Sequence, residues 1–277
     1  MIRVFYHNDL DGKCAAHIID TSYESPTEMS FVEMDYGREF PLNMVDKGDK
    51  VFIVDYSIEP EIMEQLQAKC EAVIWIDHHK TAIEKYEDYP KNISGLRSVD
   101  YAGCVLTWFY MNGLAVIDDV PAYIRMIGDR DTWQWKYGDR TRYYCSGAEL
   151  YNLNPLESFN WSVVMEETDY IIEQGKTVEK YKTQHNREFM EAFSYKTTLD
   201  GHSAIAVNMF LVGAEVFAGQ LEDVDIGILY VHNGSEFKVG LRSERVDVSE
   251  IALKYGGGGH AGASGFMCKE LPWLKGD

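Results

Sequence analysis

Val73-Ile74-Trp75-Ile76-Asp77-His78-His79 joins a run of four apolar residues to a polar cluster. Such a run, rich in β-branched and aromatic residues, predicts a strand that is covered on both faces, as in a parallel sheet. Residues 51–54 repeat the pattern, and residues 3–6 form a third strand-like run. Stretches with helical periodicity lie between and after these runs, over residues 13–19, 59–70, 105–111 and 121–127. Strands that alternate with helices predict right-handed βαβ units, and hence an α/β domain with a parallel sheet.

The pattern changes after residue 155. Residues 156–193 are rich in charge, contain no proline and carry apolar residues at helical intervals, so we expect a long connector helix. Strand-like runs then return, followed by one short helix, over residues 195–199, 204–207, 226–231, 237–241 and 249–255. We therefore expect a first domain over residues 1–155, the connector over residues 156–193 and a smaller second domain over residues 194–277.

The composition of the chain limits its partners. Asp and Glu outnumber Lys and Arg by 45 to 26, which gives a net charge of −19. A protein that tracks long nucleic acid needs a basic surface, so this acidity argues against long duplex substrates and for a small ligand in a pocket. No apolar run approaches the ~20 residues of a membrane helix, and the first residues resemble a strand rather than a signal peptide, so we expect a cytoplasmic protein without membrane contact. The five cysteines are scattered and form no CxxC pair, which disfavours disulfides and a thiolate zinc site.

Acidic and imidazole side chains follow each of the three strand-like runs. His7-Asn8-Asp9-Leu10-Asp11-Gly12 follows the first, Asp55 the second and Asp77-His78-His79 the third, while Gly128-Asp129-Arg130-Asp131-Thr132 follows a predicted helix. Because ligands of open parallel sheets bind beyond the carboxyl ends of the strands, we expect these segments at one edge of the sheet. Each segment alone has an ordinary explanation, as a helix cap, a turn or a surface pair. Crowded together, however, the carboxylates would repel one another, and bound cations relieve that cost best.

The residue types narrow the choice of metal. Carboxylates with imidazoles and no thiolate favour Mn²⁺ or Mg²⁺, and other transition ions such as Co²⁺ could also bind. Two ions about 3.5–4 Å apart can generate a hydroxide nucleophile and neutralise both the attacking and the leaving oxygen of a phosphoryl group. Asp55, at the end of the central strand, is the natural candidate for a carboxylate that bridges two ions.

A second group of residues lies near the carboxyl terminus. Arg242 and Ser243 follow a strand-like run, and four glycines at positions 256–259 precede His260. Consecutive glycines allow positive φ angles and close approach to a ligand, and their amides can bind an anion. Arg242 and His260 could add hydrogen-bond donors to a phosphate. The ordinary alternative is a flexible loop that ends a helix.

These motifs resemble those of the DHH family of phosphoesterases. The four segments that carry His7, Asp55, Asp77 and Asp131 match the ordered motifs of its catalytic domain, and the Arg-Ser pair with the GGGGH run matches the DHH-associated domain. The resemblance covers almost the whole chain and points to the nanoRNase and pAp-phosphatase branch. It implies a parallel-sheet DHH domain joined by a long connector helix to a smaller α/β domain with a mixed sheet.

The resemblance also implies a role for each motif residue. It implies two divalent cations, usually Mn²⁺, with these ligands: His7 and Asp9 for one ion, Asp11, His78 and Asp131 for the other, and Asp55 between them. His79 would face the substrate phosphate as an electrophile or proton donor, and Asp77 would orient the histidines. The DHH-associated domain would bind the nucleotide through Arg242, Ser243, Gly257, Gly258, Gly259 and His260.

Two positions need comment against the family pattern. His7 precedes Asp9 by two positions, whereas several branches of the family have a longer gap. In the fourth motif Asp129 competes with Asp131, and the following Thr132 favours Asp131.

We therefore expect an enzyme that hydrolyses short oligonucleotides, linear dinucleotides or 3′-phosphonucleotides of the pAp type by in-line attack of a metal-bound hydroxide. Hydrolysis of pyrophosphate or polyphosphate on the same site is an alternative, although relatives with that activity usually carry a different carboxyl-terminal domain. RecJ-like cleavage of long single strands is disfavoured by the acidity. A catalytically inactive nucleotide sensor is disfavoured by the complete set of motif carboxylates and imidazoles. The sequence does not choose among these substrates, and it leaves a homodimer open.

Overall fold

The computed structural model describes residues 1–24, 27–36, 38–113, 116–210, 212–217 and 219–274. The chain forms two compact units, Met1–Glu179 and Lys180–Asp277. Within the described ranges, no helix combines the length and the apolar character needed to cross a membrane. Cys14, Cys70, Cys104 and Cys145 are free thiols.

The first unit is built on a four-stranded, fully parallel sheet with the order β2-β1-β3-β4. Its strands are β1 (Ile2–His7), β2 (Met29–Met34), β3 (Lys50–Val54) and β4 (Ala72–Ile76). Three of these strands lie where the apolar runs predict them. The edge strand β2 is not among the predicted strands, because its residues are mostly half-buried and its sequence is only partly apolar.

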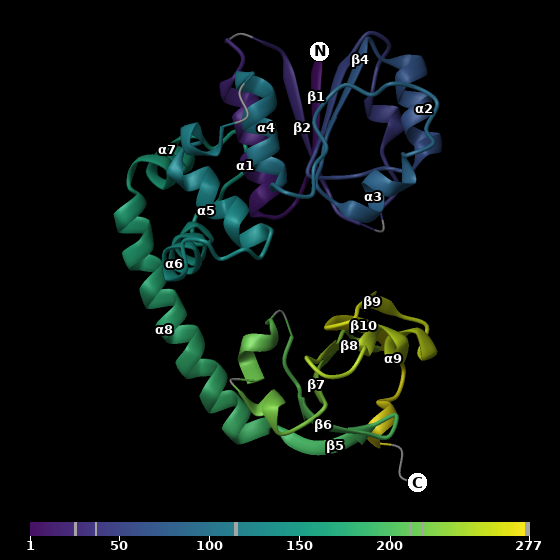
Figure 1. Ribbon diagram of the computed structural model, residues 1–277, viewed down its shortest axis with the longest axis vertical. Coiled ribbons are helices and arrows are strands. Elements are labelled where there is room, and N and C mark those ends of the chain that lie inside the picture. Colours follow the sequence, from purple (N-terminus) through teal and green to yellow (C-terminus); the bar gives the residue numbers. More distant parts are fainter. Residues whose placement is uncertain (25–26, 37, 114–115, 211, 218, 275–277) are drawn as a thin grey trace. The chain divides into compact units, whose positions relative to one another are not determined.

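Helices cover both faces of this sheet (Figure 1). One face carries α1 (Leu10–Thr21) and α4 (Gly103–Asn112), and the other carries α2 (Pro60–Lys69) and α3 (Lys80–Lys85). Alternate side chains of each strand enter opposite cores: Ile74 and Ile76 belong to one, Val73 and Trp75 to the other. Burial on both faces is therefore the reason for the continuous apolar runs.

Residues 156–193 form two helices rather than the single connector that was predicted. These are α7 (Ser158–Glu166) and α8 (Thr168–Phe193). Trp161 of α7 and Ile171 of α8 are fully buried in the core of the first unit. The same core receives side chains from α5 (Ala122–Asp131) and α6 (Asp139–Ala148). The start of the stretch is thus part of the first unit, and the later turns of α8 belong to the second.

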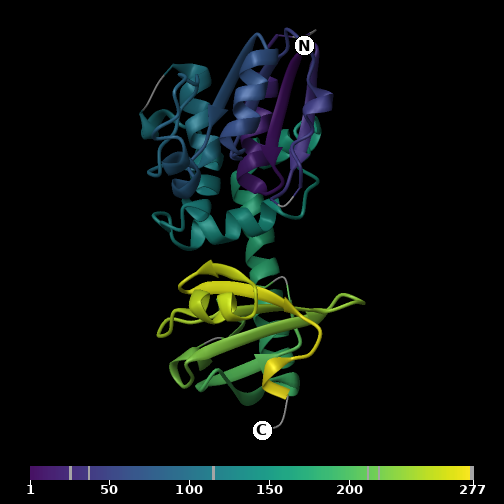
Figure 2. The ribbon, with the colours of Figure 1, turned by 90° about the vertical axis from the view of Figure 1, so that its right-hand side faces the viewer.

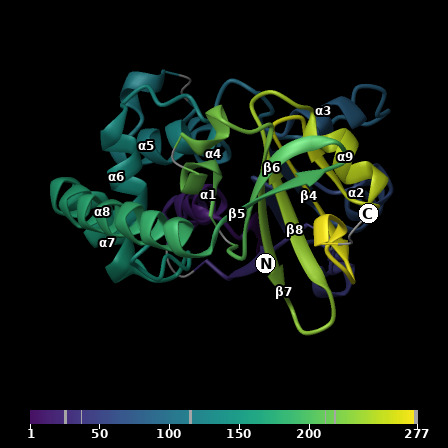
Figure 3. The same cartoon turned by 90° about the horizontal axis from the view of Figure 1, so that it is seen from below.

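The second unit contains a six-stranded mixed sheet with the order β5-β6-β7-β8-β10-β9. Its strands are β5 (Tyr195–Leu199), β6 (His202–Val207), β7 (Ile226–His232), β8 (Phe237–Arg242), β9 (Gly258–His260) and β10 (Ala263–Cys268). β6 and β7 pair in parallel and the other neighbours antiparallel. Figure 3 shows the long β7–β8 hairpin, and Figure 2 shows α9 (Val248–Lys254) against one face of the sheet. The two sheets with their helices confirm the predicted α/β class.

Short 3₁₀ turns complete the described structure. They span Leu42–Met44, Ile117–Asp119, Ala214–Phe217, Gln220–Glu222 and Pro272–Leu274.

Candidate active site

The motif residues of the first unit converge beyond the carboxyl ends of its strands. His7 ends β1, Asp55 follows β3 and His78 lies two residues after β4. Asp11 lies in the first turn of α1. Asp131 is the last residue of α5, a helix that extends four residues beyond the predicted end at residue 127.

Among the described residues, three groups of side chains could each hold a metal ion, and Asp55 belongs to two of them. The ligand atoms within each group lie within 4.8 Å of one another, and the groups are His7, Asp9 and Asp55; Asp55, His78 and His79; and Asp11, His78 and Asp131. Asp55 Oδ2 is 3.7 Å from His7 Nδ1, and its Oδ1 is 3.1 Å from His78 Nε2. His78 Nε2 is also 3.1 Å from Asp131 Oδ2. The structure thus brings together all six residues for which the sequence suggests a metal-binding role.

Backbone amides orient two of these carboxylates. Asp9 is the N-cap of α1 and accepts a hydrogen bond from the Gly12 amide at 2.9 Å. Asp11 accepts from the amides of Gly103 and Cys104, at 2.7 and 2.9 Å, at the beginning of α4. Both contacts use helix N-termini, whose amides and dipole favour a negative charge. The two carboxylates are therefore held in place without any metal ion.

Gly103 is a site residue that no sequence motif indicates. A Cβ at this position would lie 2.6 Å from Asp55 Cβ, 2.9 Å from Asp11 Oδ2 and 3.0 Å from Asp55 Oδ1. Any larger residue would displace two of the carboxylates. The only sequence signal is a glycine near the start of an apolar helix, which is too common to identify a site.

Apart from the imidazole contacts given above, several buried carboxylate oxygens in this cluster have no hydrogen-bond partner. They are both oxygens of Asp55, Oδ2 of Asp77 and Oδ2 of Asp131. The residue Asp55 is only 1% exposed, and its φ of 51° lies in a region that non-glycine residues rarely adopt. An unsatisfied buried acceptor costs about 1–3 kcal/mol, and more when it is charged. Unpaired carboxylate oxygens and local backbone strain together are features of a functional site, here one that fits cations.

The electrostatics of the cluster also favour cations. Burial, and then the charge of Asp55, raises the pKa of Asp11 to about 8, while burial and the charge of Asp11 raise the pKa of Asp131 to about 7. Burial raises the pKa of Asp55 well above its usual range. Burial opposes the charged forms of His7 and Asp9 as well, but the hydrogen bond between the two side chains favours both charges. With their other hydrogen bonds, it raises the pKa of His7 to about 10 and lowers the pKa of Asp9 to about 2. Divalent cations would replace the protons that the metal-free site retains.

His79, at the edge of the cluster, is paired with Asp77. Asp77 Oδ1 accepts from His79 Nδ1 at 2.7 Å and from the His78 amide at 2.8 Å. Asp77 is fully buried, whereas about a third of the His79 side chain is exposed. Because Nδ1 is bonded to the carboxylate, Nε2 is the ring nitrogen left to face a substrate.

Asp129 has a structural task instead. Its carboxylate accepts hydrogen bonds from the amides of Lys136 and Tyr137 and from the hydroxyl of Thr141. These contacts hold the turn that follows α5. Of the two aspartates that compete for the fourth motif, Asp131 is the one that lies in the cluster.

The second unit places Arg242 and His260 in one row of its sheet. Arg242 of β8 is paired with Ala263 of β10, which is paired in turn with His260 of β9. Paired residues of antiparallel strands project to the same face, and two strand spacings amount to about 10 Å. β9 is an edge strand, so part of its backbone N–H groups point away from the sheet. This row therefore places hydrogen-bond donors on one face of the sheet, from the interior strand β8 to the edge strand β9.

The glycine run is mostly explained by the fold. Gly258 and Gly259 belong to the edge strand β9, whereas Gly256 and Gly257 precede it. Gly256 has a φ of 78° after α9, and a Cβ on Gly257 would lie 2.0 Å from the Gly265 oxygen. A Cβ on Gly259 would lie within 3 Å of β10. Only Gly258 has no atom within 4 Å of a built Cβ and no positive φ, so it is the glycine that the fold leaves unexplained.

Ser243 is engaged within its own loop. Its hydroxyl donates to the Asp225 carbonyl at 2.7 Å and accepts from the amides of Arg245 and Val246. The residue is buried. These contacts account for Ser243 as the residue that shapes the turn after β8.

Comparisons with known proteins show which proteins the chain is similar to. No family model matches the chain. The chain is 23% identical to the oligoribonuclease NrnB of Bacillus subtilis (strain 168), across 96% of this chain and 72% of that protein. It is also 23% identical to the bifunctional oligoribonuclease and PAP phosphatase NrnA of Mycoplasma pneumoniae, across 97% of this chain and 87% of that protein.

Solved structures share the fold. The pGpG-specific phosphodiesterase PggH from Vibrio cholerae has a TM-score of 0.52 at 14% identity and matches 97% of this chain and 94% of its own. The exonuclease RecJ bound to manganese has a TM-score of 0.50 at 15% identity and matches 96% of this chain and 85% of its own. At these identities the likeness concerns the fold alone.

Taken with the ordered motifs, these relatives define a class of hydrolases that act on phosphoester bonds. In its motifs and in these relatives, the chain resembles the DHH family of phosphoesterases.

Proposed function

We propose that this protein uses two divalent cations to hydrolyse a phosphoester bond in a short oligonucleotide, a linear dinucleotide or a 3′-phosphonucleotide. The observation that carries the proposal is the buried carboxylate of Asp55, whose two oxygens have no hydrogen-bond partner and face His7 on one side and His78 on the other. A carboxylate in this position can contact two ions at once. The named activities of the NrnB and NrnA relatives support the substrate class.

The residues present fit a pair of such ions. One ion would be held by His7, Asp9 and Asp55, and the other by Asp55, Asp11, His78 and Asp131. Oxygen and imidazole donors without thiolate suit Mn²⁺, the ion in the RecJ neighbour. When bound, two such ions supply an activated water and offset the charge that develops on the phosphoryl oxygens.

His79 would act on the substrate rather than on the metal. Asp77 holds Nδ1 of its ring, so Nε2 can donate a hydrogen bond to a phosphate oxygen or a proton to the leaving oxygen. Removing the imidazole should therefore lower turnover and leave cation binding intact.

The second unit would bind the nucleotide. Arg242 can pair with a phosphate through two N–H groups, and His260 stands in the same row of the sheet. The open position at Gly258 allows a ligand to approach the backbone of the edge strand.

A panel of substrates tests the proposal. With Mn²⁺ we expect hydrolysis of pApA, pGpG or pAp, and much slower hydrolysis of pyrophosphate, c-di-AMP or a longer RNA. His79→Ala should lower kcat by about 10²- to 10⁴-fold, the usual contribution of a general acid, with Mn²⁺ affinity retained. Nucleotide binding without turnover of any substrate would instead indicate a sensor, and full activity of His79→Ala would remove the role given to this residue.

A further inference from the structure

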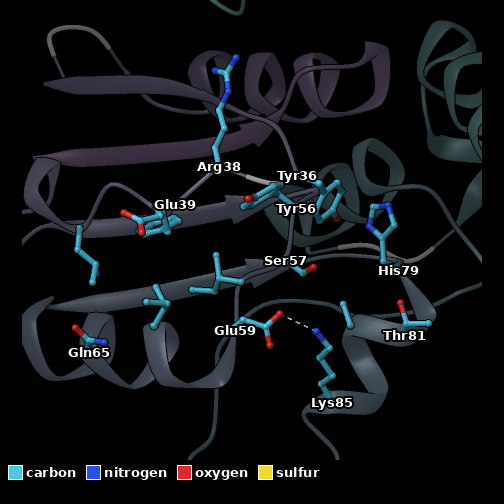
Figure 4. Close-up of a pocket in the computed structure, with 15 residues that line it drawn as sticks. Tyr36, Arg38, Glu39, Tyr56, Ser57, Glu59, Gln65, His79, Thr81 and Lys85 are labelled. Atoms are coloured by element: carbon cyan, nitrogen blue, oxygen red, sulfur yellow. Dashed lines mark hydrogen bonds and ion pairs between the residues drawn. The ribbon is translucent and has the colours of Figure 1, made fainter. Parts of the chain in front are cut away.

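A cavity of about 680 Å³ lies beside the candidate active site, against the face of the first sheet that α2 and α3 cover (Figure 4). His79 forms part of its wall, so the cavity and the metal-binding cluster share a side chain. Its volume is in the range of sites that hold small organic ligands. None of the motifs accounts for the other residues that line it.

An aromatic ring stands at the end of the cavity next to His79. The ring centroid of Tyr36 is 5.9 Å from that of His79 and 5.1 Å from that of Tyr56, with 30° between the two tyrosine planes. Tyr56 is buried, whereas Tyr36 is 47% exposed. The buried ring thus supports the exposed one. A ring that is fixed on one side and open on the other is a platform on which a flat heterocycle can stack.

The rest of the lining suits an uncharged, flat ligand. Its apolar part consists of Phe40, Leu42, Ile58, Ile62 and Ala82. Lys85 is paired with Glu59 at 2.7 Å, and the remaining charges of the lining, on Arg38 and Glu39, are of opposite sign. Ser57 and Gln65 add uncharged donors and acceptors. A second phosphate would find no net positive charge here, whereas a nucleobase needs an apolar contact surface with a few polar groups.

We propose that this cavity is a subsite for one of the two nucleosides that the scissile phosphate joins. The inference rests on the proposed function, because it takes the phosphate to lie at the metal-binding cluster on the other side of His79. The base stacks on Tyr36, and the polar side chain of Ser57, which lies on the same side of the cavity, bonds to its edge. The sugar then lies next to His79, at the end of the cavity that faces the cluster.

The test removes the ring of Tyr36 by substitution and, separately, one base of the substrate by using analogues. The substrates are pApA and two analogues that each lack one of its bases, with kcat and KM measured in Mn²⁺. Tyr36→Ala should raise KM for pApA about 5- to 100-fold, the range that a lost base–aromatic stack gives, and Tyr36→Phe should retain the wild-type value. On the analogue that lacks the base held in the cavity, wild type and Tyr36→Ala should perform alike.

A binding measurement gives an independent readout. The probe is a dinucleotide that carries 2-aminopurine in place of the held base, and binding is measured in chelator. Its fluorescence should fall when it binds the wild-type protein or Tyr36→Phe, because the base stacks on the ring. Its fluorescence should not fall when it binds Tyr36→Ala. An equal loss of activity by Tyr36→Ala on pApA and on both analogues would overturn the subsite, because Tyr36 would then act only through His79. Unchanged kinetics of Tyr36→Ala on pApA would overturn it too. If wild-type protein with Mn²⁺ hydrolysed no phosphoester at all, the proposed function itself would fail.

Discussion

The substitution Asp55→Asn should stabilise the metal-free protein and abolish its stabilisation by Mn²⁺. Asp55 is 1% exposed, and neither of its oxygens has a hydrogen-bond partner. Its negative charge also raises the pKa of Asp11. An amide has the same shape without the charge, so the substitution removes both the desolvation cost and the repulsion.

The size of the effect follows from the burial. Replacing a poorly compensated buried charge by a neutral group of similar volume commonly gains about 1–3 kcal/mol. For a unit of this size, residues 1–179, we expect Tm to rise by about 2–10 °C. Wild-type protein at a Mn²⁺ concentration of about 100 times Kd gains about 2.7 kcal/mol, whereas the variant gains little. The order of stability of the two proteins should therefore reverse between chelator and Mn²⁺.

Thermal unfolding followed by circular dichroism at pH 8, in chelator and in Mn²⁺, measures this reversal. Asp129→Asn is the matched control, because Asp129 is similarly buried but accepts three hydrogen bonds. The free energy of unfolding of Asp129→Asn should be about 1–3 kcal/mol lower than that of wild type in both conditions. The side-chain NH₂ group of asparagine would face N–H and O–H donors that now bond to the carboxylate. If Asp55→Asn were also less stable than wild type in chelator, the conclusion that Asp55 is held in place for cations would be wrong.

Three further predictions concern the glycines and the pH dependence. Gly103→Ala and Gly128→Ala should each lower the free energy of unfolding by about 1–3 kcal/mol through overpacking. Only Gly103→Ala, whose Cβ would meet two carboxylates, should also weaken Mn²⁺ binding, by about 10- to 100-fold in titration calorimetry. In chelator, the free energy of unfolding measured with denaturant should fall as the pH rises from about 4 to 8. The folded protein retains protons on Asp11, with a pKa of about 8, and on Asp131, with a pKa of about 7. The unfolded chain releases these protons near pH 3.8, so each pH unit above that value favours unfolding. Saturating Mn²⁺ should remove this dependence, and a flat profile in chelator would contradict it. Gly258→Ala, where a Cβ meets no atom within 4 Å, should unfold like wild type and yet raise KM for dinucleotides; an unchanged KM would exclude ligand contact at this position.

Much of the first unit follows from local patterns. β1, β3 and β4 are continuous apolar runs because both faces of the sheet are buried, and such runs are easily read. The edge strand β2 lacks that signal, since it is only half-buried. The strand β9 is a stretch of glycines and one histidine, which no strand propensity would predict.

The sequence by itself determines which side chains gather at the site. His7, Asp55 and His78 follow strands that must lie parallel, so their meeting at one edge is a consequence of chain direction alone. Tertiary structure decides what stands around them. Asp131 comes from the end of α5, Gly103 from the start of α4, and their contacts depend on how closely helices pack against the sheet. Helix packing arises from volumes summed over many residues distant in sequence, and no short pattern encodes it.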